Sequence, residues 1–79
     1  MEVFLKLYAQ LEKYILQPDQ NGVTTLSLSE NCTVGEMLKS VGIPSGEAGF
    51  ILLNGNAAQE EQKLKTGDRV EVFPPLEGG

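Results

Sequence analysis

Alternating apolar and polar positions predict two β-strands in the N-terminal part of the chain. Residues 2–8 place three apolar side chains on one face and Phe4, Lys6 and Tyr8 on the other, which is the two-residue period of a strand. Residues 23–29 repeat this period with two leucines on one face. The connection between the two strands contains several turn-forming residues, and it has room for one short helical turn at Leu11, Tyr14 and Ile15.

One helix is predicted in the middle of the chain. Thr33 and Glu36 have the spacing of a capping box, in which the threonine hydroxyl accepts a hydrogen bond from the N3 amide and the glutamate reaches back to the cap. Gly42 and Pro44 supply the stop signals. We therefore expect a helix over residues 34–41. Its apolar stripe follows the i, i+3, i+4, i+7 spacing and consists of Val34, Met37, Leu38 and Val41.

Three more strands are expected in the C-terminal part. Residues 50–54 form a mainly apolar run of strand length, which indicates a strand that is buried on both faces or nearly so. Residues 56–58 follow as a short edge strand, and Leu64 is the apolar anchor of the polar loop after it. Residues 69–73 alternate again and form the last strand. The proline pair that follows ends the sheet, since proline has no amide hydrogen to donate to the ladder.

The order of these elements predicts an α+β fold. A single helix after a pair of strands covers one face of a sheet. The first and last strands have the composition of central strands, and a right-handed crossover makes them a parallel pair in a mixed sheet. This is the ubiquitin-like β-grasp arrangement. We expect one domain over residues 1–75 and a flexible tail over residues 76–79.

Charge and composition exclude several classes of function. The 79 residues carry six basic and eleven acidic side chains, a net charge of -5, whereas nucleic-acid binding depends on clustered Lys and Arg. We expect no nucleic acid as partner, and instead a protein surface with basic residues. The N-terminus lacks the apolar core of a signal peptide, and no stretch has the ~20 apolar residues of a membrane span. The expected location is therefore the cytoplasm, with no membrane partner.

Candidate catalytic chemistry is sparse. The chain has one cysteine and no histidine, so it forms no internal disulfide and lacks the usual zinc ligand and the usual general base. Cys32 stands just before the predicted helix, where a helix N-terminus favours a thiolate, but a thiol nucleophile needs a base partner. We interpret Cys32 as a small residue in a turn. We expect neither a bound cofactor, nor a metal, nor an enzyme that acts alone.

The chain resembles the MoaD/ThiS family of ubiquitin-like sulfur carriers over essentially its whole length. Several segments carry the resemblance, and the most specific is the ending Phe73-Pro74-Pro75-Leu76-Glu77-Gly78-Gly79, which is closest to the small subunit of molybdopterin synthase. The other matching segments are Leu7-Tyr8-Ala9, Thr33 to Leu38, Leu53-Asn54-Gly55 and Leu64 to Val70.

The resemblance implies a function for the tail. In the family, the terminal glycine is adenylated with ATP by a ubiquitin-activating-type enzyme and is converted to a thiocarboxylate by a sulfur donor. In the molybdopterin branch the tail then enters the large subunit of molybdopterin synthase. Carried onto this chain, Gly79 holds the sulfur. The residues expected to bind partners are Gly78, Glu77, Leu76, Pro75, Phe73, Tyr8 and Ala57, although Ala57 is smaller than the residue expected at its position.

The residues of the tail suit this chemistry. Glycine has no side chain to clash in a narrow site, and the two prolines hold the preceding segment extended. The same activated glycine also serves carriers for thiazole synthesis or tRNA thiolation, and protein modifiers that are joined to lysines. A fourth alternative is a β-grasp interaction module whose tail has no task. The sequence does not decide among a carrier for molybdopterin synthesis, a carrier for thiazole synthesis or tRNA thiolation, and a protein modifier.

Overall fold

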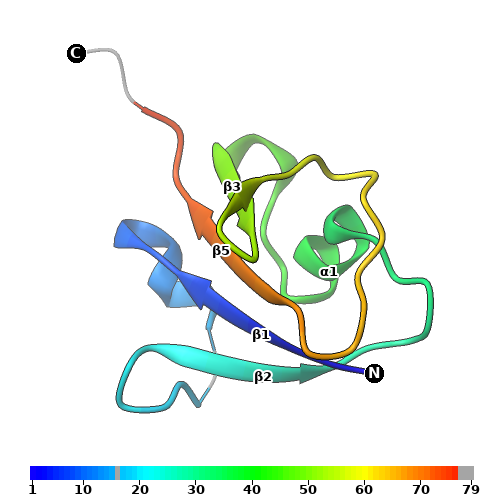
Figure 1. Cartoon of the computed structure of the whole chain (residues 1–79). Helices are drawn as coiled ribbons and strands as arrows, with labels where there is room; N and C mark the ends of the chain where they lie inside the picture. The colour runs from blue at the N-terminus through cyan, green and yellow to red at the C-terminus, as the bar shows by residue number, and fades with distance from the viewer. Residues whose placement is uncertain (16, 77–79) are drawn as a thin grey trace.

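The computed structural model describes residues 1–15 and 17–76. Within this part of the chain, five strands form one sheet in the order β2-β1-β5-β3-β4, and the helix α1 lies across one of its faces (Figure 1). Residues 74–76, which follow β5, run away from the body of the molecule. The elements are β1 (Glu2–Leu7), η1 (Ala9–Tyr14, 3₁₀), β2 (Val23–Ser27), α1 (Val34–Ser40), η2 (Ser45–Glu47, 3₁₀), β3 (Phe50–Leu53), β4 (Asn56–Ala57) and β5 (Arg69–Phe73).

The first and last strands form the parallel pair at the centre of the sheet. Leu5 lies opposite Val70, and Leu7 lies opposite Val72. β2 pairs antiparallel with β1, β3 pairs antiparallel with β5, and β4 forms the edge beside β3. The sequence-based predictions of an α+β class and a ubiquitin-like β-grasp fold are therefore confirmed.

Local hydrogen bonds start α1 where the sequence predicts. The Thr33 hydroxyl accepts from the Glu36 amide at 3.1 Å, and the Glu36 carboxylate accepts from the Thr33 amide at 2.9 Å. The hydrogen bond from the Thr33 amide is the main reason why the pKa of Glu36 lies below its usual value. The helix ends at Ser40, one residue before the predicted end, because Val41 is already the C-cap and Gly42 has a φ of +88°.

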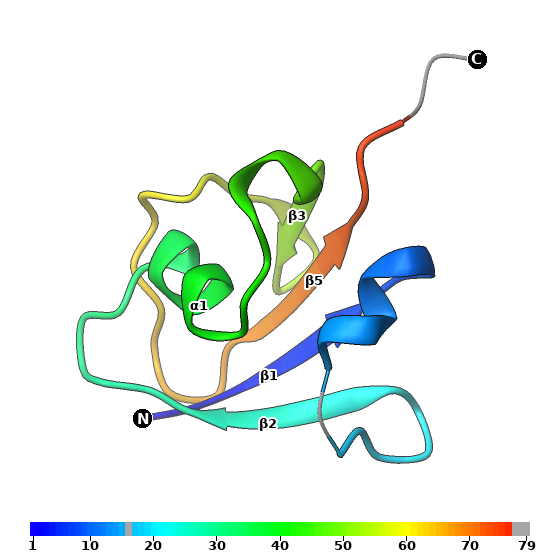
Figure 2. The same cartoon turned by 180° about the vertical axis from the view of Figure 1, so that it is seen from behind.

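The core lies between the sheet and α1. Figure 2 shows α1 over one face of the sheet. The central strands turn alternate residues towards this side, and the apolar stripe of the helix packs against them. Leu64 is 3% exposed, so its predicted role as the anchor of a loop is confirmed. The fully buried side chains of the core include Leu5, Leu11, Met37, Val3, Val34, Val70 and Val72.

The third strand is buried on one face only, so the prediction that both its faces are buried is wrong. Ile51 and Leu53 point into the core, but Phe50 is 52% exposed and Leu52 is partly exposed. The apolar run therefore spans a buried face and a solvent-facing one. Its uniform composition conceals the alternation that the other strands display in sequence. We call the sheet face opposite α1 the open face.

The predicted helical turn is η1, and it is tied to η2. The Tyr14 hydroxyl donates a hydrogen bond to Glu47, and Lys13 Nζ lies 3.9 Å from the same carboxylate. Leu11 is fully buried and joins η1 to the core. Across the described residues, no helix is both long and apolar enough to cross a membrane.

Candidate functional site: the open face and the root of the tail

Three aromatic rings gather on the open face beside the end of β5. The rings of Tyr8 and Phe73 are stacked, with centroids 4.2 Å apart and an angle of 13° between their planes. The ring of Phe50 packs against Phe73 at 5.9 Å and 49°. We call these three residues the aromatic cluster. Aromatic pairs of this kind contribute roughly 0.5–1.5 kcal/mol each beyond the area they bury.

Strand register explains why the cluster forms at this place. Phe50 of β3 lies directly opposite Phe73 of β5. Tyr8 follows the last residue of β1, and its amide still donates to the carbonyl of Val72 at 3.1 Å. The three side chains therefore stand in a row across three neighbouring strands. Phe73 occupies the middle of the row and touches both other rings.

Charged side chains border the aromatic cluster. The Tyr8 hydroxyl donates a hydrogen bond to the Glu71 carboxylate, and Lys6 Nζ lies 5.1 Å from the centroid of the Tyr8 ring. The hydrogen bond to Glu71 is the main cause that raises the pKa of Tyr8, while the nearby Arg69 acts in the opposite direction. This hydrogen bond fixes the ring that stacks on Phe73.

The raised pKa of Tyr8 can be tested by following its ionisation in the native and the unfolded protein. In a Tyr14→Phe variant only one of the two tyrosines remains, and its ionisation can be followed by tyrosinate absorbance. We expect the native protein to titrate at higher pH than the urea-unfolded chain, because the hydroxyl donates to Glu71 only while it is protonated. The stabilisation is complete below the unfolded pKa and is lost as the pH rises through the native pKa.

The control for this titration is a further Glu71→Gln change in the same background. It removes the negative acceptor, so the native midpoint should fall towards that of the unfolded chain. Equal midpoints for the native and unfolded forms of the Tyr14→Phe variant would contradict the hydrogen bond. They would also remove the reason for a fixed ring orientation.

The root of the tail is an apolar groove at the end of β5. It has a volume of about 570 Å³, and it is lined by the two prolines, Leu76, Gly49, Phe50 and Phe73. The Gly49 amide donates to the carbonyl of Phe73 at 2.9 Å. Leu76 is the last described residue, and its side chain is fully exposed. The chain thus leaves the sheet directly beside the aromatic cluster.

The structure brings some of the predicted site residues together and leaves others apart. Tyr8 and Phe73 stack, as their shared face allows, and Pro75 and Leu76 continue from them. Ala57 is exposed on the edge strand β4, where it pairs with Leu52 and lies outside the aromatic cluster. The predicted positions Glu77, Gly78 and Gly79 lie outside the described residues. Their roles stay predictions, as does the domain boundary after residue 75.

Phe50 and Gly49 belong to this site, although the sequence did not single them out. Phe50 stands in an apolar run that conceals which of its members face solvent. Gly49 precedes that run, and nothing near it in sequence indicates that Pro75 lies against it. The one sequence signal for Phe50 is the two-residue period of β3. This period places Phe50 in the aromatic cluster only when the register that pairs Phe50 with Phe73 is known.

Comparison with known proteins assigns the family. A family described as Mut7-C ubiquitin matches residues 1–78. The chain belongs to the Mut7-C ubiquitin family. No curated protein sequence matches it.

Solved structures similar to this Mut7-C ubiquitin chain share its fold over their length. SAMP1 from Haloferax volcanii is 26% identical with a TM-score of 0.73, and each chain covers 100% of the other. The Haloferax volcanii protein HVO 2177 is 27% identical with a TM-score of 0.76, and the match covers 100% of this chain and 87% of that one. A chain in the complex of subunits 1 and 2 of molybdopterin-converting factor from Helicobacter pylori is 19% identical with a TM-score of 0.59, and each chain covers 100% of the other. The family match and the fold shared with these structures confirm that the chain is a ubiquitin-like protein, as the resemblance implies.

Cys32 in this Mut7-C ubiquitin chain lies beside Leu64, whose amide donates to the Cys32 carbonyl at 2.8 Å. Burial is the main cause that raises the pKa of its thiol, with Glu36 adding to the effect. The thiol therefore stays protonated near neutral pH, in agreement with its interpretation as a turn residue. Among the described residues, no group of three or more His, Cys, Asp or Glu side chains is placed to hold a metal ion.

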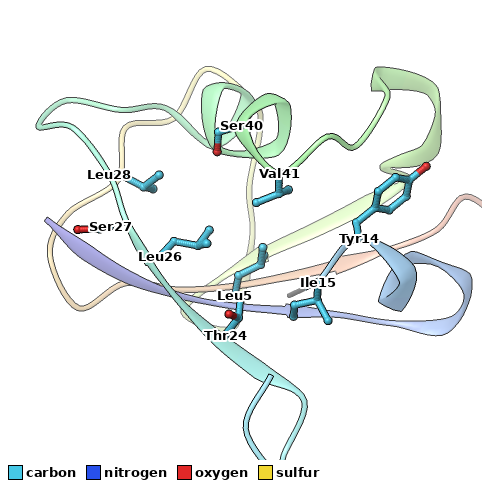
Figure 3. A pocket seen from close by; sticks show the side chains of 9 residues that line it. All are labelled: Leu5, Tyr14, Ile15, Thr24, Leu26, Ser27, Leu28, Ser40 and Val41. Carbon is cyan, nitrogen blue, oxygen red and sulfur yellow. The ribbon is translucent and has the colours of Figure 1, made fainter. Parts of the chain in front are cut away.

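A second cleft opens on the helix side of the sheet. Figure 3 shows Leu5, Leu26 and Val41 pointing into a space between β2, η1 and the end of α1. Its volume is about 380 Å³, and none of its lining residues is charged. It arises because α1 is only seven residues long, or about 10 Å, and does not reach across β2. It is separated by the sheet from the open face.

Proposed function

We propose that this protein is a ubiquitin-like sulfur carrier for molybdopterin biosynthesis, and that it is a carrier subunit without catalytic activity of its own. The observation that carries the proposal is the place of Phe73, which ends the central strand β5 and is the middle ring of the aromatic cluster. In the sequence, Phe73 is also the first residue of the ending Phe73-Pro74-Pro75-Leu76-Glu77-Gly78-Gly79. A docking surface and a reactive end are thus continuous in the chain.

The proposed chemistry takes place on the carboxyl group of Gly79. A carboxylate is a poor electrophile, so an activating enzyme first lets it attack the α-phosphorus of ATP, and pyrophosphate leaves. A sulfide equivalent then attacks the acyl carbon of the adenylate. AMP leaves with one of the former carboxylate oxygens, and the product is a thiocarboxylate. No oxidant or reductant is needed when the donor supplies sulfur at the level of sulfide.

Two protein partners follow from this chemistry. The first is the ubiquitin-activating-type adenylating enzyme that binds ATP. The second is the large subunit of molybdopterin synthase, and support comes from the fold shared with a chain in the Helicobacter pylori complex of subunits 1 and 2. We propose that both bind the aromatic cluster, because partly exposed aromatic side chains supply much of the energy of protein interfaces.

A second candidate function is protein modification. It is favoured by the full-length match to SAMP1, which is also described as small archaeal modifier protein 1. In that case the activated Gly79 would be joined to lysine amines of target proteins. Cell extract probed for this chain on a denaturing gel distinguishes the two functions, since a modifier gives a ladder of heavier bands and a pure carrier gives one.

Intact-mass spectrometry tests the proposed function. The protein is incubated with the ubiquitin-activating-type enzyme of the same organism, ATP and sulfide. We expect a mass increase equal to the replacement of one oxygen by one sulfur, with the change confined to the C-terminal peptide after proteolysis. A reaction without ATP is the control and should give no change. If several such enzymes produced no increase, the sulfur-carrier function would be wrong.

A further inference from the structure

Gly49 lies in unusually close contact with Pro74 and Pro75, the two residues before the tail. A Cβ atom built on Gly49 would overlap the N and Cα atoms of Pro75 and would lie 2.8 Å from the carbonyl carbon of Pro74. Carbon atoms pack at roughly 3.5–4.0 Å. Any side chain at residue 49 therefore requires the backbone of Pro74 and Pro75, or the start of β3, to move.

The backbone conformation of Gly49 does not by itself require glycine. Its φ is outside the left-handed region, unlike those of Gly22, Gly42, Gly55 and Gly67. Close approach of another backbone is the other reason for glycine at a strand end. The residue that approaches here is Pro75, so this glycine is explained by the contact with Pro75 and not by a turn.

The root of the tail is held by restraints on both sides of this contact. The Gly49 amide donates to the carbonyl of Phe73 at 2.9 Å, which fixes the last residue of β5. The two prolines that follow have restricted φ angles and cannot extend the ladder. Pro75 thus rests on the bare backbone of Gly49 while the chain turns away from the sheet.

We propose that Gly49 is a positioning residue for sulfur transfer. Its contact with Pro75 fixes the position of that residue and so sets the direction in which residues 76–79 enter a partner. This inference rests on the proposed function of Gly79. Covalent geometry limits the reach of the last carboxyl group to roughly 14 Å beyond Pro75. Only four residues separate Pro75 from that carboxyl group, so a displaced root can leave it away from the reacting atoms, and a misplacement of about 1 Å can lower a rate about 100-fold.

The test compares Gly49→Ala with Gly46→Ala in the thiocarboxylation reaction with ATP and sulfide. Gly46 is a matched control, since it lies in the neighbouring η2 and its Cβ would meet no atom within 4 Å. We expect Gly49→Ala to lower kcat about 10- to 100-fold with KM within about twofold of the unchanged protein, because the aromatic cluster still docks. Gly46→Ala should change neither constant.

Nuclear magnetic resonance provides a readout that does not depend on activity. The unchanged protein and Gly46→Ala should give a nuclear Overhauser effect between the Hα protons of Gly49 and Pro75. In Gly49→Ala, the effect between the Hα protons of residues 49 and 75 should disappear. If Gly49→Ala does not fold, Pro75→Gly replaces it. That variant keeps Gly49 but frees the φ angle of the root, and a similar fall in kcat is expected.

Three results would overturn the inference. The first is the absence of the Gly49–Pro75 effect in the unchanged protein. The second is an unchanged kcat in Gly49→Ala after that effect is lost. The third is a rise in KM alone, which would place the role of Gly49 in docking. If the unchanged protein and Gly46→Ala both failed to accept sulfur, the proposed function itself would be wrong, and the inference would fall with it.

Discussion

Deletion of Gly79 should abolish sulfur transfer and leave the fold intact. The shortened chain ends on Gly78, so its carboxyl group falls one residue short, roughly 3.5 Å in an extended chain. The adenylating site is built on another protein and does not follow it. The buried core ends at Val72, and Leu76 is already fully exposed, so no core contact is lost. We expect no thiocarboxylate by intact-mass spectrometry, with an almost unchanged melting temperature.

One added glycine after Gly79 is the matched control for this deletion. It should be equally inactive, because it moves the carboxyl group by the same distance in the other direction. Both variants keep the aromatic cluster and should bind the activating enzyme with nearly unchanged affinity in calorimetry. Sulfur on the shortened chain would mean that Gly79 is not the carrier. A large loss of affinity in both variants would instead place the binding energy in the tail.

The change Phe73→Ala should weaken partner binding by about 2 kcal/mol, or roughly 30-fold in Kd. Phe73 is the middle ring of the aromatic cluster and contacts both Tyr8 and Phe50. Its removal takes away one contact surface and also releases its two neighbours from their fixed orientations. Titration calorimetry with the activating enzyme measures the change. Each variant is first checked for cooperative thermal unfolding, so that binding is compared between folded proteins.

Phe4→Ala is the control for this binding experiment. Phe4 is also a phenylalanine on the open face and is 39% exposed, but it pairs with Arg69 at the other end of β5. Its removal should change Kd by no more than about twofold. Equal losses for both variants would show that the whole face contributes evenly. If Phe73→Ala bound the activating enzyme with unchanged affinity, the aromatic cluster would have a structural role only.

Much of the fold follows from features that are local in sequence. The capping box needs only Thr33 and Glu36, three residues apart, and it starts the helix where it was predicted. The polar residue Lys6 reveals the alternation of the first strand, and both sides of that strand lie as expected. The Phe50 strand has no polar residue of this kind, which is why its exposed face was missed.

The candidate site could be predicted only in part, because only some of its features are local in sequence. The period of each strand places Tyr8 and Phe73 on the face opposite the core, and it does so without knowledge of their neighbours. Their stacking depends on the parallel pairing of the first and last strands and on its register. Ala57 was expected to bind partners from the resemblance alone, and the pairing of β4 with β3 places it, exposed, at the edge of the sheet.

By itself, the sequence determined the order and type of the elements, the inward and outward sides of its alternating strands, and an ending rich in proline and glycine. These properties depend on residues a few positions apart, whose spacing is fixed by covalent geometry and by the period of each element. Only the tertiary structure decided that Phe50 completes the aromatic cluster and that Gly49 lies under Pro75. Such contacts join distant parts of the chain, and they exist only once packing of the core has set the strand order and register.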